Sequence, residues 1–395
     1  MRNVVGQIAS KEDFYYRKKE IGTIMRNLDA KANIQIAAPR RVGKSSILYY
    51  LKDNPSKGYI NLYIEVESSR SKNDYYRKIF REILKSDVIS STKKIAEQFK
   101  SNKNGFLGRL KGIKLAGLGF DFTEPEAIDY EEELTNLLLG IDLGEDKLIL
   151  MIDEFPEVML NIVEDCNGDI VEAKKFLQSN RELRNNPKLH GRIQFIYTGS
   201  NSLNLTAANL ESTSLINDLT AISVNPLSAD EAKDLILEIL KTYKYTISQE
   251  QLDYMVSLVE WNIPFYFQLL IQEIINQIEP EDIITNKIID ESFFKIMDQR
   301  NDHHFEHYVR RLKRVFNEKE LRFVKIFLNQ LAQNEKISKG DAQNMSHGIL
   351  TESETKKVLE ALRYDGYVIN QSETGNLEYK FNSPILKQWW YNHEC

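Results

Sequence analysis

The chain has 395 residues, of which 42% are hydrophobic and 28% are charged. This balance is that of an ordinary soluble globular protein, and the length allows two or three domains. The formal net charge of −6 argues against a wholly basic nucleic-acid coat and leaves room for a local basic surface. Because no run of 18 apolar residues occurs and the N-terminus becomes charged at once, we expect a cytoplasmic protein without a membrane span. Two widely separated cysteines predict neither a disulfide framework nor a zinc site.

The first predicted elements are a helix over residues 17 to 30, a buried strand over residues 34 to 38 and a helix that starts near residue 45. The loop between the last two has the residue order of a phosphate-binding loop. In such a loop, backbone N–H groups and a helix N-terminus face phosphate oxygens, a Lys reaches the β- and γ-phosphates, and a Ser or Thr hydroxyl binds Mg²⁺. The residues of this loop are Ala38, Pro39, Arg40, Arg41, Val42, Gly43, Lys44, Ser45 and Ser46.

Lys44 and Ser45 take the phosphate and Mg²⁺ positions of this motif. Ala38 stands where the motif has its first glycine, and a small residue is tolerated there if its φ is negative. Pro39 stiffens the loop. For Arg40 and Arg41 the sequence leaves three contacts open: phosphate, a lid domain or a neighbouring subunit.

A strand over residues 59 to 66 and a helix over residues 74 to 84 follow. Residues 85 to 128 are irregular and basic, and we expect a helix and a glycine-containing hairpin inserted into the core domain. Such an insertion contacts nucleic acid or a protein partner, or is a solvated charged face. Its basic residues before Gly117 are Lys93, Lys94, Lys100, Lys103, Arg109, Lys111 and Lys114.

A helix over residues 131 to 139, a buried strand over 147 to 152, a helix over 173 to 185 and a buried strand over 192 to 197 come next. Alternating apolar strands and helices predict a right-handed, doubly wound parallel α/β sheet. Asp153 and Glu154 follow one strand, and Ser200 and Asn201 follow the other. Ligands bind at the carboxyl edge of such a sheet, so Asp153 is expected to hold Mg²⁺ and Glu154 to act as general base. Ser200 or Asn201 is expected to sense the γ-phosphate.

From residue 225 the pattern is helical to about residue 314, beginning with a capping box of Ser228 and Glu231. Helices over residues 318 to 330, 339 to 345 and 352 to 365 then precede strands over 367 to 369 and 377 to 382. This order is that of a winged helix-turn-helix. We therefore predict three domains: a P-loop core over 1–224, an all-α lid over 225–316 and a winged helix over 317–395. Near the end of the predicted lid, the closely spaced His303, His304 and His307 favour a solvated helical face over a metal site.

Seven segments together resemble the archaeal-type ATPase family, within the STAND and AAA+-related P-loop NTPases. They read DFYYRKKEI before the first strand, APRRVGKSS, MIDEFPE, YTGSNSL, NPLSADEA, NIP and FNSPILKQWW. The resemblance implies an ASCE-type core, ATP and Mg²⁺ as ligands, and slow hydrolysis coupled to closure of the lid. It also places Arg17 near the nucleotide base and Pro264 in a lid turn, in which Asn262 replaces glycine and is expected to adopt the left-handed conformation. Arg181 and Arg184 lie where arginine fingers occur.

Three functions are consistent with this reading. The first is an ATP-driven switch with a protein partner or a second copy of the chain. The second is a DNA-binding ATPase adaptor of replication-initiator or transposition-regulator type, which binds duplex DNA through the winged helix or the basic insertion. The third is a non-hydrolysing scaffold that uses nucleotide structurally.

Overall fold

The computed structural model describes residues 1–86, 88, 128–200, 202–371 and 377–395. These residues form two compact units. The sheet unit comprises Arg17–Ala37 and Ile47–Ser223, and the helical unit comprises Met1–Tyr16, Ala38–Ser46 and Val224–Cys395. The predicted basic insertion lies almost entirely outside the described residues. Asn201 also lies outside them.

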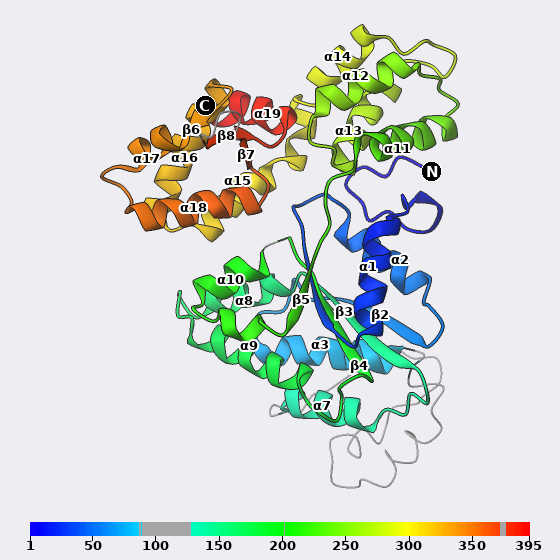
Figure 1. The fold of residues 1–395 in the computed structure, drawn as a ribbon, viewed down its shortest axis with the longest axis vertical. Helices are drawn as coiled ribbons and strands as arrows, with labels where there is room; N and C mark the ends of the chain where they lie inside the picture. Colours follow the sequence, from blue (N-terminus) through cyan, green and yellow to red (C-terminus); the bar gives the residue numbers. More distant parts are fainter. Residues whose placement is uncertain (87, 89–127, 201, 372–376) are drawn as a thin grey trace. The chain divides into compact units, whose positions relative to one another are not determined.

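The sheet unit is built on five parallel strands in the order β2-β3-β4-β1-β5 (Figure 1). The strands are β1 (Asn33–Ala37), β2 (Tyr59–Glu65), β3 (Lys147–Asp153), β4 (Ile193–Tyr197) and β5 (Leu219–Ser223). Because they are parallel, all their carboxyl ends lie at one edge of the sheet. Strand β4 lies between β1 and β3 in the sheet.

Helices cover both faces of this sheet. Alternate β3 residues Leu148, Leu150 and Ile152 belong to one apolar core that also includes residues of α3, α7, α8 and α9. On the other face, the Gln194 side chain donates to the carbonyl oxygens of Leu28 and Ala32 at the end of α1. The helices of this unit are α1 (Lys18–Asp29), α2 (Lys44–Asp53, which starts in the phosphate loop), α3 (Lys72–Lys85), α7 (Tyr130–Gly140), α8 (Phe155–Asp165), α9 (Val171–Arg184), α10 (Leu203–Asn209) and the 3-10 turn η2 (Thr213–Ile216).

The predicted strands and helices of this unit are present, with ends shifted by one or two residues. The prediction lacks β5, a short edge strand in which only Leu219 and Ile222 are buried. Five residues with so little apolar periodicity do not stand out from a loop. The prediction also lacks two helices, α8, which starts directly after Glu154, and the short α10.

The helical unit contains helices from residue 229 to residue 315, as predicted, and the capping box of Ser228 and Glu231 is formed. They are α11 (Ala229–Thr242), α12 (Gln249–Val259), α13 (Pro264–Ile275), α14 (Asn286–Lys295), η3 (Gln299–His304) and α15 (Glu306–Val315), with η1 (Lys11–Asp13) in the N-terminal segment. None of the helices in the described part of the chain is long and apolar enough to cross a membrane.

The C-terminal part of the helical unit contains three helices, a three-stranded antiparallel sheet in the order β6-β8-β7, and a final helix. The elements are α16 (Glu318–Gln333), β6 (Ile337–Ser338), α17 (Lys339–Ser346), α18 (Glu352–Tyr364), β7 (Val368–Gln371), β8 (Glu378–Phe381) and α19 (Pro384–Glu394). The first three helices and the β7–β8 pair match the predicted elements. Strand β6 and helix α19 do not appear in the prediction.

Candidate functional site

The phosphate loop, residues 38–46, leaves strand β1 at the carboxyl edge of the sheet. Its backbone takes positive φ at Arg41 (66°) and Gly43 (100°). Ala38 is not among the positive-φ residues, so it meets the condition under which it replaces glycine. The left-handed conformation of Arg41 carries a cost of roughly 1–2 kcal/mol for a residue with a Cβ. Strained loop residues of this kind concentrate at ligand-binding loops.

Lys44 begins α2 and is almost fully buried, with 7% of its surface exposed. Its ammonium group donates to the carbonyl oxygens of Ala38 (2.9 Å) and Pro39 (2.8 Å), so the side chain curls over its own loop. The Ser46 hydroxyl accepts the backbone N–H of Ala9 at 3.0 Å. The first turn of α2 therefore presents Lys44 toward the loop and ties Ser46 to the N-terminal segment.

The phosphate loop also lies against α13 and the turn after α18, which belong to the same helical unit. The Arg41 guanidinium carbon lies 4.5 Å from the centre of the Phe265 ring in α13. A Cβ added to Gly366, between α18 and β7, would lie 3.2 Å from Pro39 Cβ and 2.6 Å from the Trp261 ring. The sequence leaves three contacts open for the arginines, and the structure shows Arg41 against Phe265 of α13, in the segment that the sequence predicts as a lid.

Asp153 and Glu154 end β3 in the sheet unit. Asp153 is buried and accepts hydrogen bonds from the Tyr63 hydroxyl (2.9 Å) and the Glu154 backbone N–H (3.0 Å). Burial and the neighbouring Asp153 carboxylate raise the pKa of Tyr63, which keeps this hydroxyl a donor. The sequence reading missed Tyr63; the signal was its place near the carboxyl end of the strand that pairs with β3.

Glu154 and Ser200 meet at the ends of β3 and β4. The Glu154 Oε2 atom accepts the backbone N–H of Ser200 at 2.8 Å and its hydroxyl at 2.9 Å. Glu154 has a left-handed backbone (φ 59°). At Gly199 a Cβ would lie 2.5 Å from Pro156 and 3.4 Å from Glu154 Oε2, so glycine is required for this approach. Ser200 therefore fixes the orientation of the candidate general base.

Arg17 pairs with Glu20 in the sheet unit, with a distance of 2.6 Å and both side chains buried. Pro264 is the first residue of α13. The prediction of a left-handed Asn262 is wrong: the positive φ (54°) falls on Glu260, the C-cap of α12. Helix α12 ends there, and the chain is already extended at Ile263, as the residue before a proline prefers.

Arg184 lies where arginine fingers occur, but the structure places it neither as a finger nor as a solvated surface residue. Its side chain is 0% exposed and binds Asp218 at 2.6 Å and Asn180 at 3.0 Å, so it holds α9 in place and cannot reach a neighbouring molecule. Arg181 is partly exposed and donates to Asn217. The prediction of a solvated histidine face is also wrong for His307, whose two ring nitrogens are buried.

The side chains of the candidate site have the chemical groups that bind a magnesium nucleotide. The Ser45 hydroxyl and the Asp153 carboxylate are oxygen donors, and Mg²⁺ is bound in such sites by one or two protein oxygens together with phosphate and water. Among the described residues there is no group of three His, Cys, Asp or Glu side chains that could hold a metal by itself. A metal bound through only one or two of these oxygens would need phosphate and water as further ligands.

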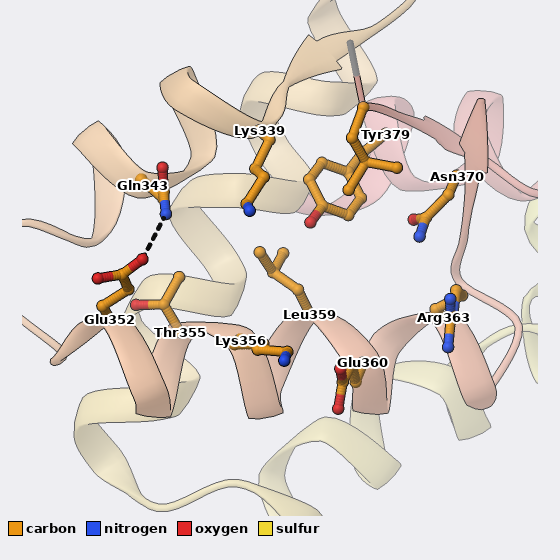
Figure 2. Close-up of a pocket in the computed structure, with 11 residues that line it drawn as sticks. Lys339, Gln343, Glu352, Thr355, Lys356, Leu359, Glu360, Arg363, Asn370 and Tyr379 are labelled. Atoms are coloured by element: carbon orange, nitrogen blue, oxygen red, sulfur yellow. Dashed lines mark hydrogen bonds between the residues drawn. The ribbon is translucent and has the colours of Figure 1, made fainter. Parts of the chain in front are cut away.

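A groove of about 150 Å³ lies between α17, α18 and the β-ribbon in the C-terminal part of the helical unit (Figure 2). Its floor is apolar, with Leu359 and Tyr379. Gln343 donates to Glu352 at 3.2 Å across one end of it. Its charged residues have both signs: Lys339, Lys356, Arg363, Glu352 and Glu360.

The structure is similar to two solved ATPase-fold proteins along nearly its whole length. The Walker-type ATPase PABY2304 of Pyrococcus abyssi is 17% identical, with a TM-score of 0.61, over 98% of this chain and 99% of that one. The ORC2 protein of Aeropyrum pernix, solved in ADPNP–ADP complexes, is 11% identical, with a TM-score of 0.58, over 99% of this chain and 95% of that one. No protein-family model and no curated protein matches the sequence. At these identities the likeness shows the fold: a parallel-sheet P-loop NTPase core of the kind found in Walker-type and Orc ATPases.

Proposed function

We propose that the protein is an ATP-binding and slowly hydrolysing switch. The observation that carries this proposal is the pair Asp153 and Glu154 at the carboxyl end of β3, the sheet edge from which the phosphate loop also leaves. The nucleotide complexes of the Aeropyrum pernix protein support the same ligand class for this fold. Lys44 is assigned to the β- and γ-phosphates, Ser45 and Asp153 to Mg²⁺, and residues 38–46 to the phosphate cradle.

When bound, Mg²⁺ neutralises the developing phosphate charge. The chain itself supplies the remaining chemistry. Glu154 accepts the proton of the attacking water and is held for that task by the two hydrogen bonds from Ser200. Lys44 leaves the carbonyl oxygens of Ala38 and Pro39 for phosphate oxygens, because a charge-assisted bond to an anion is stronger than one to a neutral carbonyl.

The switch proposal rests on contacts between the phosphate loop and the proposed lid and winged-helix segments. A phosphate group that draws Arg41 from Phe265 or shifts Pro39 changes the packing of α13 and of the turn at Gly366. ATP binding is then coupled to the arrangement of residues 225–395. Arg17, at the start of α1, is assigned to the nucleotide-base side of the site, and Pro264, at the start of α13, to the lid turn that binds nucleotide.

Gly366→Ala tests this coupling. A Cβ there would lie 2.6 Å from Trp261 and 3.2 Å from Pro39 at φ +81°, so the Trp261 ring or the turn must move and Pro39 of the phosphate loop must give by a few tenths of an ångström. We expect a lower thermal midpoint and a severalfold change in ATP affinity. Gly348→Ala is the matched control, because it has nearly the same φ (+78°) and no neighbour within 4 Å. Equal ATP affinities in the two variants, measured by titration, would show that the contact does not couple to the loop.

For the partner, the charges of α18 favour protein over DNA. Its exposed charged residues are three acidic and three basic: Glu352, Glu354, Glu360, Lys356, Lys357 and Arg363. Binding to the DNA backbone depends on an excess of Lys and Arg that neutralises phosphates, and the exposed charges of this helix sum to zero. The apolar floor of the groove in Figure 2 suits a protein segment instead.

The decisive experiment measures phosphate release and oligomer size with and without duplex DNA. The switch predicts measurable ATP turnover and an oligomeric state that depends on nucleotide. Salt-dependent DNA binding that weakens when Lys103, Arg109 and Lys111 are neutralised would favour the DNA-binding adaptor. Absence of phosphate release under every condition, with ATP still bound, would favour the scaffold.

A further inference from the structure

Tyr63 and Asp153 project from the same face of the parallel sheet. The register of β2 and β3 pairs Glu65 with Asp153, and Tyr63 precedes Glu65 by two residues. Because side chains alternate along a strand, all three lie on the face opposite to the apolar core that includes Leu150 and Ile152. The pairing of the two strands thus brings the Tyr63 phenol to the Asp153 carboxylate.

The Asp153 carboxylate is held at both of its oxygen atoms. Oδ2 accepts the Tyr63 hydroxyl at 2.9 Å, and Oδ1 accepts the backbone N–H of Glu154 at 3.0 Å. Asp153 is only 2% exposed, so bulk water does not compete for these bonds. Donors on two different oxygens restrict rotation of the carboxylate about its Cβ–Cγ bond. The backbone bond is available to any residue except proline at position 154, whereas the other bond requires the Tyr63 side chain.

The Tyr63 ring is itself supported by α2. Its centre lies 4.5 Å from the centre of the Tyr49 ring, and the two ring planes are tilted by 54°. Two residues earlier in β2, the Asn61 side chain donates to the carbonyl oxygen of Leu51 in α2 at 2.6 Å. A tyrosine side chain has only two torsions, so a ring packed on one side and bonded at its hydroxyl is a stiff support.

We propose that Tyr63 is a positioning residue whose hydroxyl keeps the Asp153 carboxylate in the orientation that binds the Mg²⁺ of a bound nucleotide. This role rests on the proposed function, in which Asp153 is a Mg²⁺ ligand. Tyr63 acts through Asp153 and is given no contact with the metal. Residues that hydrogen-bond a metal-ligating carboxylate contribute roughly 10- to 100-fold to metal affinity, because they orient the ligand before the metal arrives.

The experiment uses Tyr63→Phe, which removes the hydroxyl and keeps the ring. The dissociation constant of a non-hydrolysable ATP analogue is measured for the natural chain and the variant, once with Mg²⁺ and once with EDTA. The constant in EDTA divided by the constant in Mg²⁺ is the tightening of nucleotide binding by the metal. We expect this tightening to be about tenfold smaller in Tyr63→Phe, with the constant in EDTA unchanged. No turnover enters the measurement.

Tyr59→Phe is the matched control. Tyr59 lies on the same face of β2 at the other end of the strand, and its hydroxyl also donates to a carboxylate, that of Asp29, at 2.5 Å. The control should keep the tightening of the natural chain. Thermal unfolding of both variants checks that each is folded. If Tyr63→Phe does not fold, Tyr49→Leu takes its place, because it removes the ring that supports Tyr63, and a severalfold fall is expected.

A second comparison introduces Tyr63→Phe into an Asp153→Asn chain. Without the carboxylate the hydroxyl has no metal ligand to position, so Tyr63→Phe should not reduce the tightening further. A reduction of equal size in both backgrounds would show that the hydroxyl only supports the fold, and would overturn the proposal. Full tightening in Tyr63→Phe itself would overturn it as well.

Failure of the proposed function gives a different result. A natural chain that binds the analogue neither with Mg²⁺ nor with EDTA is not an ATP-binding switch, and the role of Tyr63 falls with that assignment. A natural chain that binds the analogue equally well with and without Mg²⁺ keeps its nucleotide site but removes Asp153 as a metal ligand, which overturns the proposal for Tyr63 alone.

Discussion

Glu154→Gln is expected to bind ATP as tightly as the natural chain and to release phosphate at least 100-fold more slowly. The glutamine oxygen can accept the same bonds from Ser200, so the end of β3 keeps its geometry. What is lost is the ability to take a proton from water, and general-base catalysis contributes roughly 10²- to 10⁴-fold. Single-turnover phosphate release and equilibrium binding of ATP, measured on the same sample, separate the two effects.

Two further variants test whether the loss of turnover in Glu154→Gln is specific to this side chain and to its orientation. Glu164→Gln, at the far end of α8, is exposed and should leave turnover unchanged. Ser200→Ala removes one of the two bonds that orient Glu154 and keeps the backbone one, so a smaller loss of about tenfold is expected. Undiminished turnover in Glu154→Gln would remove Glu154 from the mechanism and assign proton transfer to another group.

Much of this arrangement follows from local sequence. The buried strands β3 and β4 are apolar runs that end in polar residues, and parallel pairing brings those ends to one edge, which is how Glu154 and Ser200 come together. The phosphate loop is recognisable because its chemistry depends on residues adjacent in the chain. Strand β5 was not predicted because an edge strand needs little apolar periodicity.

Contacts between distant residues could not be predicted in the same way. Nothing in the sequence near Arg41 specifies that its guanidinium lies over the Phe265 ring, and nothing near His307 specifies that its ring nitrogens are buried. The same limit explains the two errors at arginine and asparagine positions. Arg184 lies where arginine fingers occur, whereas in the structure it is buried against Asp218, which lies 34 residues later in the chain. At Asn262 the intrinsic preference for a left-handed turn was overridden by the place where α12 ends.

Lys44→Ala is expected to weaken ATP binding by at least 100-fold and to abolish turnover. Lys44 is almost fully buried at the start of α2, and its ammonium group is the nearest cation to the loop carbonyls of Ala38 and Pro39. Hydrogen bonds to charged groups contribute about 1.5–3 kcal/mol each, and the ammonium group has three donors for phosphate oxygens. Loss of two such bonds accounts for the expected change. Titration with a fluorescent ATP analogue measures it.

Two further variants, Lys52→Ala and Lys44→Met, separate the loss of phosphate binding in Lys44→Ala from a loss of loop structure. Removing Lys44 also frees the two carbonyl oxygens it caps, so the phosphate loop loses internal bonds as well as a phosphate ligand. Lys52→Ala, at the exposed end of the same helix, removes an equal charge without touching the loop and should bind ATP normally. Lys44→Met keeps most of the aliphatic stem and removes only the charge. If Lys44→Met binds ATP as well as Lys52→Ala does, the loop does not hold phosphate through Lys44, and the assignment of residues 38–46 as a phosphate cradle is wrong.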